Sequence, residues 1–308
     1  MDDERLRTLY HALMHHSTYR TAQQPGRRRT FADALIALVY LYAALCDRSP
    51  RWASDLRHWP LWCRSVLVLP SYSQLMRRLK TAAVARLIAQ FSAELRQRLP
   101  RAAEKIIDGK PLVVGGFSKD PDATVGVVPA GWARGYRVHL IVDAASAAVE
   151  AVIVTALHVG EATVALDLLP RTELHGGGGG GGGVVLRGDA NYDSNRLYAA
   201  VADAGGRLLA PRKRPGTDLG HHVAAHHPHR LAAIAQLEDP HDPTALHDAQ
   251  RHRNRIEQVL AHLSNLPFGL APLPNFVRRL WRVRLWVMAK IVLYHQHLVL
   301  RQALACAA

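Results

Sequence analysis

Cysteine is scarce in this sequence, and what there is lies scattered. The three cysteines, Cys46, Cys63 and Cys306, are odd in number and form no Cys-x-x-Cys pair. This usage excludes a disulfide framework and argues against a zinc site, and it is typical of a protein in a reducing compartment. Aromatic residues are also few, at 6% of the 308 residues, but the hydrophobic fraction of 49% is enough for a sizeable core.

Long hydrophobic runs are missing as well. The longest, Ala34 to Cys46, is too short to cross a bilayer, and the apolar C-terminal segment carries several arginines and Lys290. The first residues, MDDERLRTLYHALMHH, begin with acids and contain no apolar stretch, unlike a signal peptide. We therefore expect a cytoplasmic protein that has no membrane partner.

Acidic residues are fewer than basic residues. Lysine and arginine together number 39 against 25 acids, which gives a formal net charge of +14. Arginine far outnumbers lysine, and its forked guanidinium suits phosphate groups and guanine edges. Genome base composition explains the preference for arginine equally well, but it does not explain the net charge. The excess indicates a polyanionic partner, of which nucleic acid is the commonest.

Hydrophobic periodicity divides the chain near residue 100. Residues 1–100 have a helical pattern: the segment 31–46 is apolar on all sides, which is typical of a helix buried in a bundle, and Ser71 or Ser73 caps the next helix. From Lys105 onward the pattern is that of strands. Strands are expected at 105–108, 135–143, 149–155, 184–189 and 207–210, and helices at 161–169, 194–204, 248–265 and 276–306.

Three strands, a helix, a strand, a helix and a strand follow the order of a ribonuclease H-like fold. We predict an α/β catalytic core, a mixed five-stranded sheet with flanking helices, over residues 101–308. Residues 1–100 are predicted to form an all-helical DNA-binding or dimerisation region. The run Gly176–Gly183 should be a mobile surface loop, and residues 214–247, rich in His, Pro and Asp, should be an irregular insertion.

Three acids occupy positions suited to metal chemistry. Asp108 follows two buried isoleucines, Asp189 ends the strand VVLRGD, and Glu257 lies on a late helix, four residues after Arg253. Cleavage of a phosphodiester by two divalent cations needs hard oxygen ligands, which carboxylates supply. Each acid alone is more often an ordinary loop or cap residue, but their joint placement on two strand ends and a helix is more specific.

Other polar residues have simpler interpretations. Asp193 is expected to cap the following helix, Asp143 to end a strand at a turn, and Asp120 and Asp122 to be turn residues or to line a substrate channel. A histidine cluster completes no defined metal site and is expected to belong to a polar insertion: His221, His222, His226, His227 and His229.

Several motifs resemble the DDE transposases of bacterial insertion sequences, in particular the IS-four-like group. They are IDGKPLVVGGFSKDPDA at 107–123, GWARGYRVH at 131–139, GDANYDSN at 188–195 and RIE at 255–257, together with DRSPRWA at 47–53 and the segment 69–79 in the helical region. The resemblance covers most of the chain and is weakest in the glycine run and the histidine-rich stretch.

The resemblance implies that Asp108, Asp189 and Glu257 are the three catalytic acids, holding two magnesium ions that manganese can replace. It implies metal-dependent strand cleavage and strand transfer at the ends of an insertion sequence by a nucleoid-associated protein. The partners would be double-stranded DNA, both transposon ends and target, and further copies of the chain. The arginines expected to contact DNA are Arg27, Arg28, Arg29, Arg77, Arg78 and Arg253.

Two positions depart from the pattern of the group. Gln250 stands where its members carry a tyrosine, and Ser264 stands where they carry a lysine; both of those residues usually contact transposon-end phosphates. The alternatives are therefore a catalytically inactive or domesticated DNA-binding protein derived from a transposase, and a nuclease of the same fold. The basic run at 27–29 is also compatible with a solvated surface patch.

Overall fold

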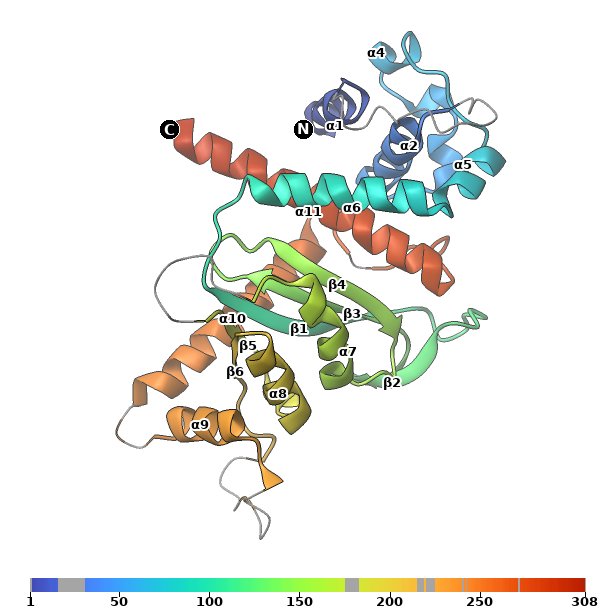
Figure 1. Cartoon of the computed structure of the whole chain (residues 1–308). Helices are drawn as coiled ribbons and strands as arrows, with labels where there is room; N and C mark the ends of the chain where they lie inside the picture. Colours follow the sequence, from blue (N-terminus) through green and yellow to red (C-terminus); the bar gives the residue numbers. More distant parts are fainter. Residues whose placement is uncertain are drawn as a thin grey trace. The chain divides into compact units, whose positions relative to one another are not determined.

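The computed structural model describes residues 2–15, 31–174, 183–214, 219, 225–239, 241, 243–270 and 272–307. The chain forms two compact units, one of residues 1–98 and 263–308 and the other of residues 99–262 (Figure 1). Arg27, Arg28, Arg29, His221 and His222 lie outside the described residues, as do Gly176–Gly182 and the side chains of Gln250 and Arg253.

The first unit is entirely helical. Its elements are α1 (Asp2–His15), α2 (Asp33–Leu45), α3 (Pro50–Ala53), the 3-10 turn η2 (Leu56–His58), α4 (Leu61–Arg64), α5 (Tyr72–Leu79), α6 (Ala82–Gln97) and α11 (Leu280–Ala307). Every residue of α2 is buried, including Asp33 at its start, and the remaining residues are apolar, as expected of a helix inside a bundle. Ser71, rather than Ser73, caps α5, because its side chain and that of Gln74 form a reciprocal capping box.

The division of the chain differs from the sequence-based boundaries at its C-terminal end. Residues 263–308 belong with the N-terminal helices rather than with the sheet, and the division falls inside α10 (Pro243–Asn265). The reason is α11, whose residues from Val283 to Tyr294 are almost continuously buried and pack against α2 and α6. A helix that is apolar on most sides needs partners all round, and two helices of the first unit supply them.

The second unit is built on one mixed sheet. Its strands are β1 (Glu104–Val113), β2 (Thr124–Val128), β3 (Gly131–Asp143), β4 (Val149–Ala156), β5 (Val185–Arg187) and β6 (Arg207–Leu209). β3 runs antiparallel to β1, β2 and β4, whereas β5 runs parallel to both β1 and β6. The resulting order, β4-β3-β1-β5-β6, confirms the predicted ribonuclease H-like core.

Strand β2 is an addition that the sequence did not predict. It pairs with the first residues of β3, which begins four residues earlier than expected. Gly126 interrupts its alternation, but glycine is needed there because a Cβ would lie 2.9 Å from the Leu157 carbonyl oxygen.

Helices α7 (Glu161–Leu168) and α8 (Asn195–Asp203) cover one face of the sheet and enclose its core. Ile107 of β1 and Ile141 of β3 meet Leu168 and Leu197 there. The predicted irregular insertion is partly helical, because Pro228–Leu237 forms α9, with Pro228 at its start and Ala233, Ile234 and Leu237 buried. Within the described residues, no helix is both long enough and apolar enough to cross a bilayer.

Candidate active site

Two of the three predicted acids are brought together by the parallel pairing of β1 and β5. The last paired residues of these strands are Ile106 and Arg187, and each strand carries an aspartate two residues further on. Asp108 is therefore on the central strand of the sheet, and Asp189 lies just beyond the end of its neighbour. Equal spacing from a shared register places both carboxylates at the same end of the sheet.

The environment of Asp108 strongly favours its protonated form. Burial, above all, raises the pKa of this carboxyl to about 7, and the charges of Asp189, Glu161 and Glu257 raise it further. One interaction opposes them: the backbone N–H of Gly109 donates a hydrogen bond to Oδ1 of Asp108 at 2.7 Å. A carboxyl group surrounded by three other acids is costly to ionise unless a cation joins it.

Asp189 is held in place by the turn that follows β5. Its Oδ1 accepts the backbone N–H of Asn191 at 2.8 Å, and its Oδ2 accepts the Asn191 side-chain amide at 3.0 Å. Gly188 permits this turn, because a Cβ there would lie 2.8 Å from the ring of Tyr192. The strand exit, the glycine and the asparagine together fix the direction of the carboxylate.

Glu257 comes from α10, more than 60 residues further along the chain. The neighbouring Ile256, Val259 and Leu260 are buried, whereas Glu257 is exposed. Its carboxylate is near enough to raise the pKa of Asp108. The structure thus brings Asp189 and Glu257 each within electrostatic range of Asp108.

A fourth acid of the cluster, Glu161, was not predicted from the sequence. It is the first residue of α7, and its charge also raises the pKa of Asp108. Its Oε1 accepts a hydrogen bond from Nη1 of Arg137 at 2.6 Å. An acid in the first turn of a helix is the ordinary complement of the helix dipole, so only the spatial arrangement distinguishes this one.

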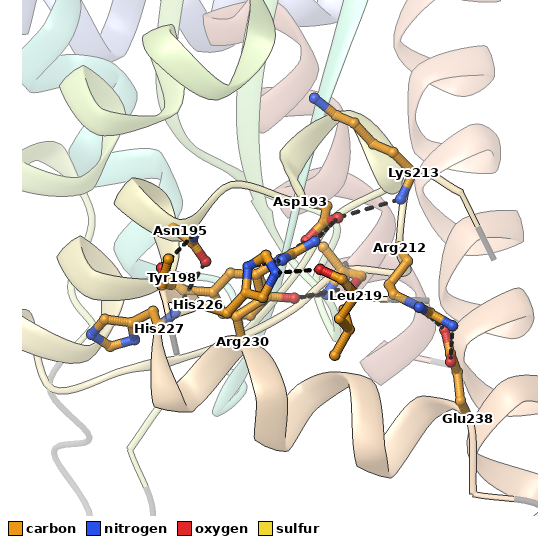
Figure 2. A network of polar contacts seen from close by, with 12 residues as sticks. Asp193, Asn195, Tyr198, Arg212, Lys213, Leu219, His226, His227, Arg230 and Glu238 are labelled. Atoms are coloured by element: carbon orange, nitrogen blue, oxygen red, sulfur yellow. Dashed lines mark hydrogen bonds and ion pairs between the residues drawn. The ribbon is translucent and has the colours of Figure 1, made fainter. Parts of the chain in front are cut away.

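Asp193, close to the site in sequence, has a different role from the one expected. It does not cap α8; it accepts two hydrogen bonds from Arg230 of α9, from Nε at 2.6 Å and from Nη2 at 2.8 Å. Figure 2 shows this pair within a polar network that also includes Asn195 and His226. Both partners are largely buried, so the pair attaches α9 to the loop after β5.

Two arginines of the helical unit that were predicted to contact DNA, Arg77 and Arg78, have different surroundings. Arg77 is exposed on α5, as a phosphate contact requires. Arg78 turns inward instead, donating to the Phe31 carbonyl oxygen at 2.9 Å and pairing with the buried carboxylate of Asp33. A buried acid needs a cation partner, so the pair of Arg78 and Asp33 stabilises the fold. Ser264, at the position of the expected lysine, is buried.

The chemistry of the donor set fits a hard divalent cation. The gathered side chains offer carboxylate oxygens, the ligands that magnesium prefers, and the pKa of Asp108 is raised first by burial and then by the neighbouring negative charges. In the described part of the chain, no three acidic, histidine or cysteine side chains already converge as a set of metal ligands. The carboxylates are thus neighbours whose mutual repulsion a cation would relieve.

Comparison with known proteins identifies a family and a distant structural likeness. A family model described as a transposase DDE domain matches residues 103–294. No curated protein matches. Among solved structures, the chain is similar to the piggyBac transposase synaptic complex with hairpin DNA, at 13% identity and a TM-score of 0.30. The match covers 68% of this chain and 47% of that one, so the chain spans just under half the length of that transposase.

Proposed function

Because the chain belongs to the transposase DDE domain family, we propose that it is a DNA transposase that cleaves and joins strands at the ends of an insertion sequence. The observation that carries the proposal is the approach of Asp189 and Glu257 to Asp108, across 81 and 149 residues of chain, close enough to raise its pKa. Perturbed acids gathered at a strand end are typical of catalytic sites.

Asp108, Asp189 and Glu257 would hold two divalent cations, magnesium or manganese. When bound, such ions activate the attacking oxygen and stabilise the leaving oxygen of a phosphodiester. The chain's own part is positioning: the central strand fixes Asp108, Asn191 orients Asp189, and α10 presents Glu257 from its exposed side. Held in this way, the acids need little reorganisation when the substrate binds.

DNA is the proposed partner, in the bacterial cytoplasm and nucleoid. The net charge of +14 supports attraction to phosphates, and Arg77 and Arg253 are proposed contacts. Because two transposon ends must be cut together, we also propose that copies of the chain associate on DNA.

One observation favours a second candidate, a DNA-binding protein that has lost catalysis. Gln250 and Ser264 occupy positions where the resembled group has its end-binding tyrosine and lysine. A protein of this kind would keep the fold and the basic charge while binding ends too weakly or wrongly for cleavage.

The experiment that separates the two candidates measures strand cleavage on DNA fragments carrying the sequences that flank the gene on either side. We expect cleavage with magnesium or manganese, its loss in Asp108→Asn with DNA binding retained, and normal cleavage by Asp167→Asn. Asp167 is an exposed acid on α7 and serves as the matched control. If the wild-type protein binds these fragments but cuts none with either metal, the non-catalytic candidate is correct.

A further inference from the structure

We propose that Glu161 is a fourth carboxylate of the metal site and binds a divalent cation together with Asp108 and Asp189. This inference rests on the proposed function and deepens it, because it changes the ligand set from three acids to four. It comes from three observations: the position of the Glu161 side chain, the absence of a side chain at Gly109, and the hydroxyl of Tyr192, which has no hydrogen-bond partner among the described residues.

The backbone makes room for Glu161 beside Asp108. Gly109 directly follows Asp108 on β1, and a Cβ at this glycine would lie 2.9 Å from Oε1 of Glu161 and 3.3 Å from Cδ of Arg137. Any larger residue would push the glutamate away from the strand. The glycine therefore lets the carboxylate approach the backbone one residue from the first predicted catalytic acid.

The contacts of Glu161 hold it in this position. Nη1 of Arg137 donates to its Oε1 at 2.6 Å, and Nη2 of Arg137 is anchored on the Val127 carbonyl oxygen at 2.9 Å. A side-chain hydrogen bond from Asn191, the residue that orients Asp189, also reaches Glu161. One asparagine thus contacts both acids, which links their positions.

The simplest alternative is that Glu161 and Arg137 are a structural ion pair. An ion pair alone requires only that the carboxylate meet the guanidinium. Here the carboxylate also lies against the backbone at Gly109, next to Asp108, and accepts a hydrogen bond from Asn191, which holds Asp189. Its position is therefore set toward the other acids as well as toward Arg137.

An independent observation indicates that a ligand belongs among these acids. Tyr192 is fully buried, and its hydroxyl has no hydrogen-bond partner in the described part of the chain. Burial raises the pKa of this phenol most, and the charges of Asp108, Glu161 and Asp189 raise it further, so the ring lies close to all three acids. A buried phenol without a partner is costly, and a hydrated cation between the acids would supply one.

The test measures Mn²⁺ binding by the full-length protein at pH 8, with isothermal titration calorimetry and the electron paramagnetic resonance of free Mn²⁺. Wild type is compared with Glu161→Gln, which keeps the size and hydrogen-bonding capacity of the side chain, and with Asp167→Asn on the same helix. We expect Glu161→Gln to weaken Mn²⁺ binding by at least about tenfold and Asp167→Asn to leave it unchanged.

A second variant covers the case in which Glu161→Gln does not fold. Glu161→Asp keeps the charge but withdraws the carboxylate by one methylene, and it should weaken binding severalfold. Wild-type affinity in a folded Glu161→Gln or Glu161→Asp variant overturns the inference while leaving the three-acid site intact. Failure of the wild-type protein to bind Mn²⁺ at all overturns the proposed function together with it.

Discussion

The two units of the molecule treat buried charge in opposite ways. In the helical unit, Lys290 is fully buried, and its ammonium group pairs with the Asp47 carboxylate at 2.5 Å and the Ala44 carbonyl oxygen at 2.7 Å. Asp33 is likewise paired with Arg78. In the sheet unit, Asp108 instead lies among acids of its own sign, and Arg137 is the cation paired with one of them.

The difference separates buried charges that are paired within the fold from the acids to which we assign the proposed chemistry. A paired buried ion is already neutralised, so its environment is complete without any ligand. A cluster of acids raises the free energy of the empty protein, and such a cluster is retained where a bound cation compensates it. Asp193 and Arg230 show that the sheet unit also forms ordinary pairs when no ligand is involved.

The sharpest contrast can be made within one loop, between Asp189 and Asp193. We expect Asp189→Asn to reduce metal-dependent cleavage by at least about 1000-fold while the protein stays folded, because a metal ligand is lost. Asp193→Asn should preserve cleavage by the folded protein but lower its free energy of unfolding, because Arg230 loses its partner. Cleavage rates and urea unfolding would check both, and cleavage by Asp189→Asn within tenfold of wild type would contradict the assignment.

Breaking the buried pair of the helical unit should affect stability alone. Asp47→Asn leaves the Lys290 ammonium group without its counter-charge, and we expect the free energy of unfolding to fall by about 2 kcal/mol. Asparagine tolerates the positive φ of 51° at this position, so backbone strain is not added. The matched variant Lys290→Met removes the buried charge itself and should be nearly neutral. Equal losses for both variants would show that packing, not charge, dominates there.

In the acid cluster, removing a carboxylate charge in metal-free buffer should raise the free energy of unfolding, whereas removing that of Asp47 should lower it. Burial raises the pKa of Asp108 from 3.8 to about 7, so the folded protein binds this proton more tightly than the unfolded chain. Stability is therefore lost as the pH rises from about 4 to 7. We expect Asp108→Asn to stabilise the protein at pH 8 by about 1–2 kcal/mol and to have little effect at pH 4.

Thermal unfolding in EDTA at the two pH values measures this difference. Added Mg²⁺ should raise the melting temperature of the wild-type protein at pH 8 more than that of the variant, because the cation replaces the missing proton. A destabilised Asp108→Asn at pH 8 would mean that the carboxylate is compensated within the protein after all.

The smallest expected effect compares two adjacent arginines of α5. Arg77→Ala should weaken DNA binding by a few fold and reduce the salt dependence of binding by about one unit of slope, as the loss of one phosphate contact requires. Arg78→Ala should instead lower stability, because the buried Asp33 carboxylate loses this cation partner. Fluorescence anisotropy at several salt concentrations distinguishes the two, and an unchanged slope for Arg77→Ala would remove it from the proposed DNA surface.

The sequence was informative wherever local pattern determined structure. The alternation in β3 and β4 and the acids after Ile107 and Gly188 were enough to predict the ribonuclease H-like order and the positions of Asp108 and Asp189. Glu161 could not be found in this way, because its role depends on the absence of a side chain at Gly109, on a different strand. A contact between residues that are distant in the sequence does not alter the hydrophobic periodicity around either of them.

The other differences between the predictions and the structure also come from contacts between residues that are far apart in the sequence. Asp193 precedes a helix, so a capping role was the natural expectation, and only the distant Arg230 changes it. The assignment of residues 263–308 to the helical unit depends on which apolar surfaces accept α11, and periodicity identifies an apolar helix without identifying its partners. Strand β2 was not predicted because it contains Gly126, and glycine disfavours strands except where another backbone comes close.

The run of eight glycines ends at a residue that the fold constrains. A Cβ at Gly183 would lie 2.0 Å from the carbonyl oxygen of Gly205, and β5 then begins two residues later, hydrogen-bonded to strands on both sides. Repeated glycine codons are prone to replication slippage, which changes the number of residues in the run. Since the register of β5 is set after Gly183, such length variants would change the number of residues before Gly183 without shifting Asp189 relative to Asp108.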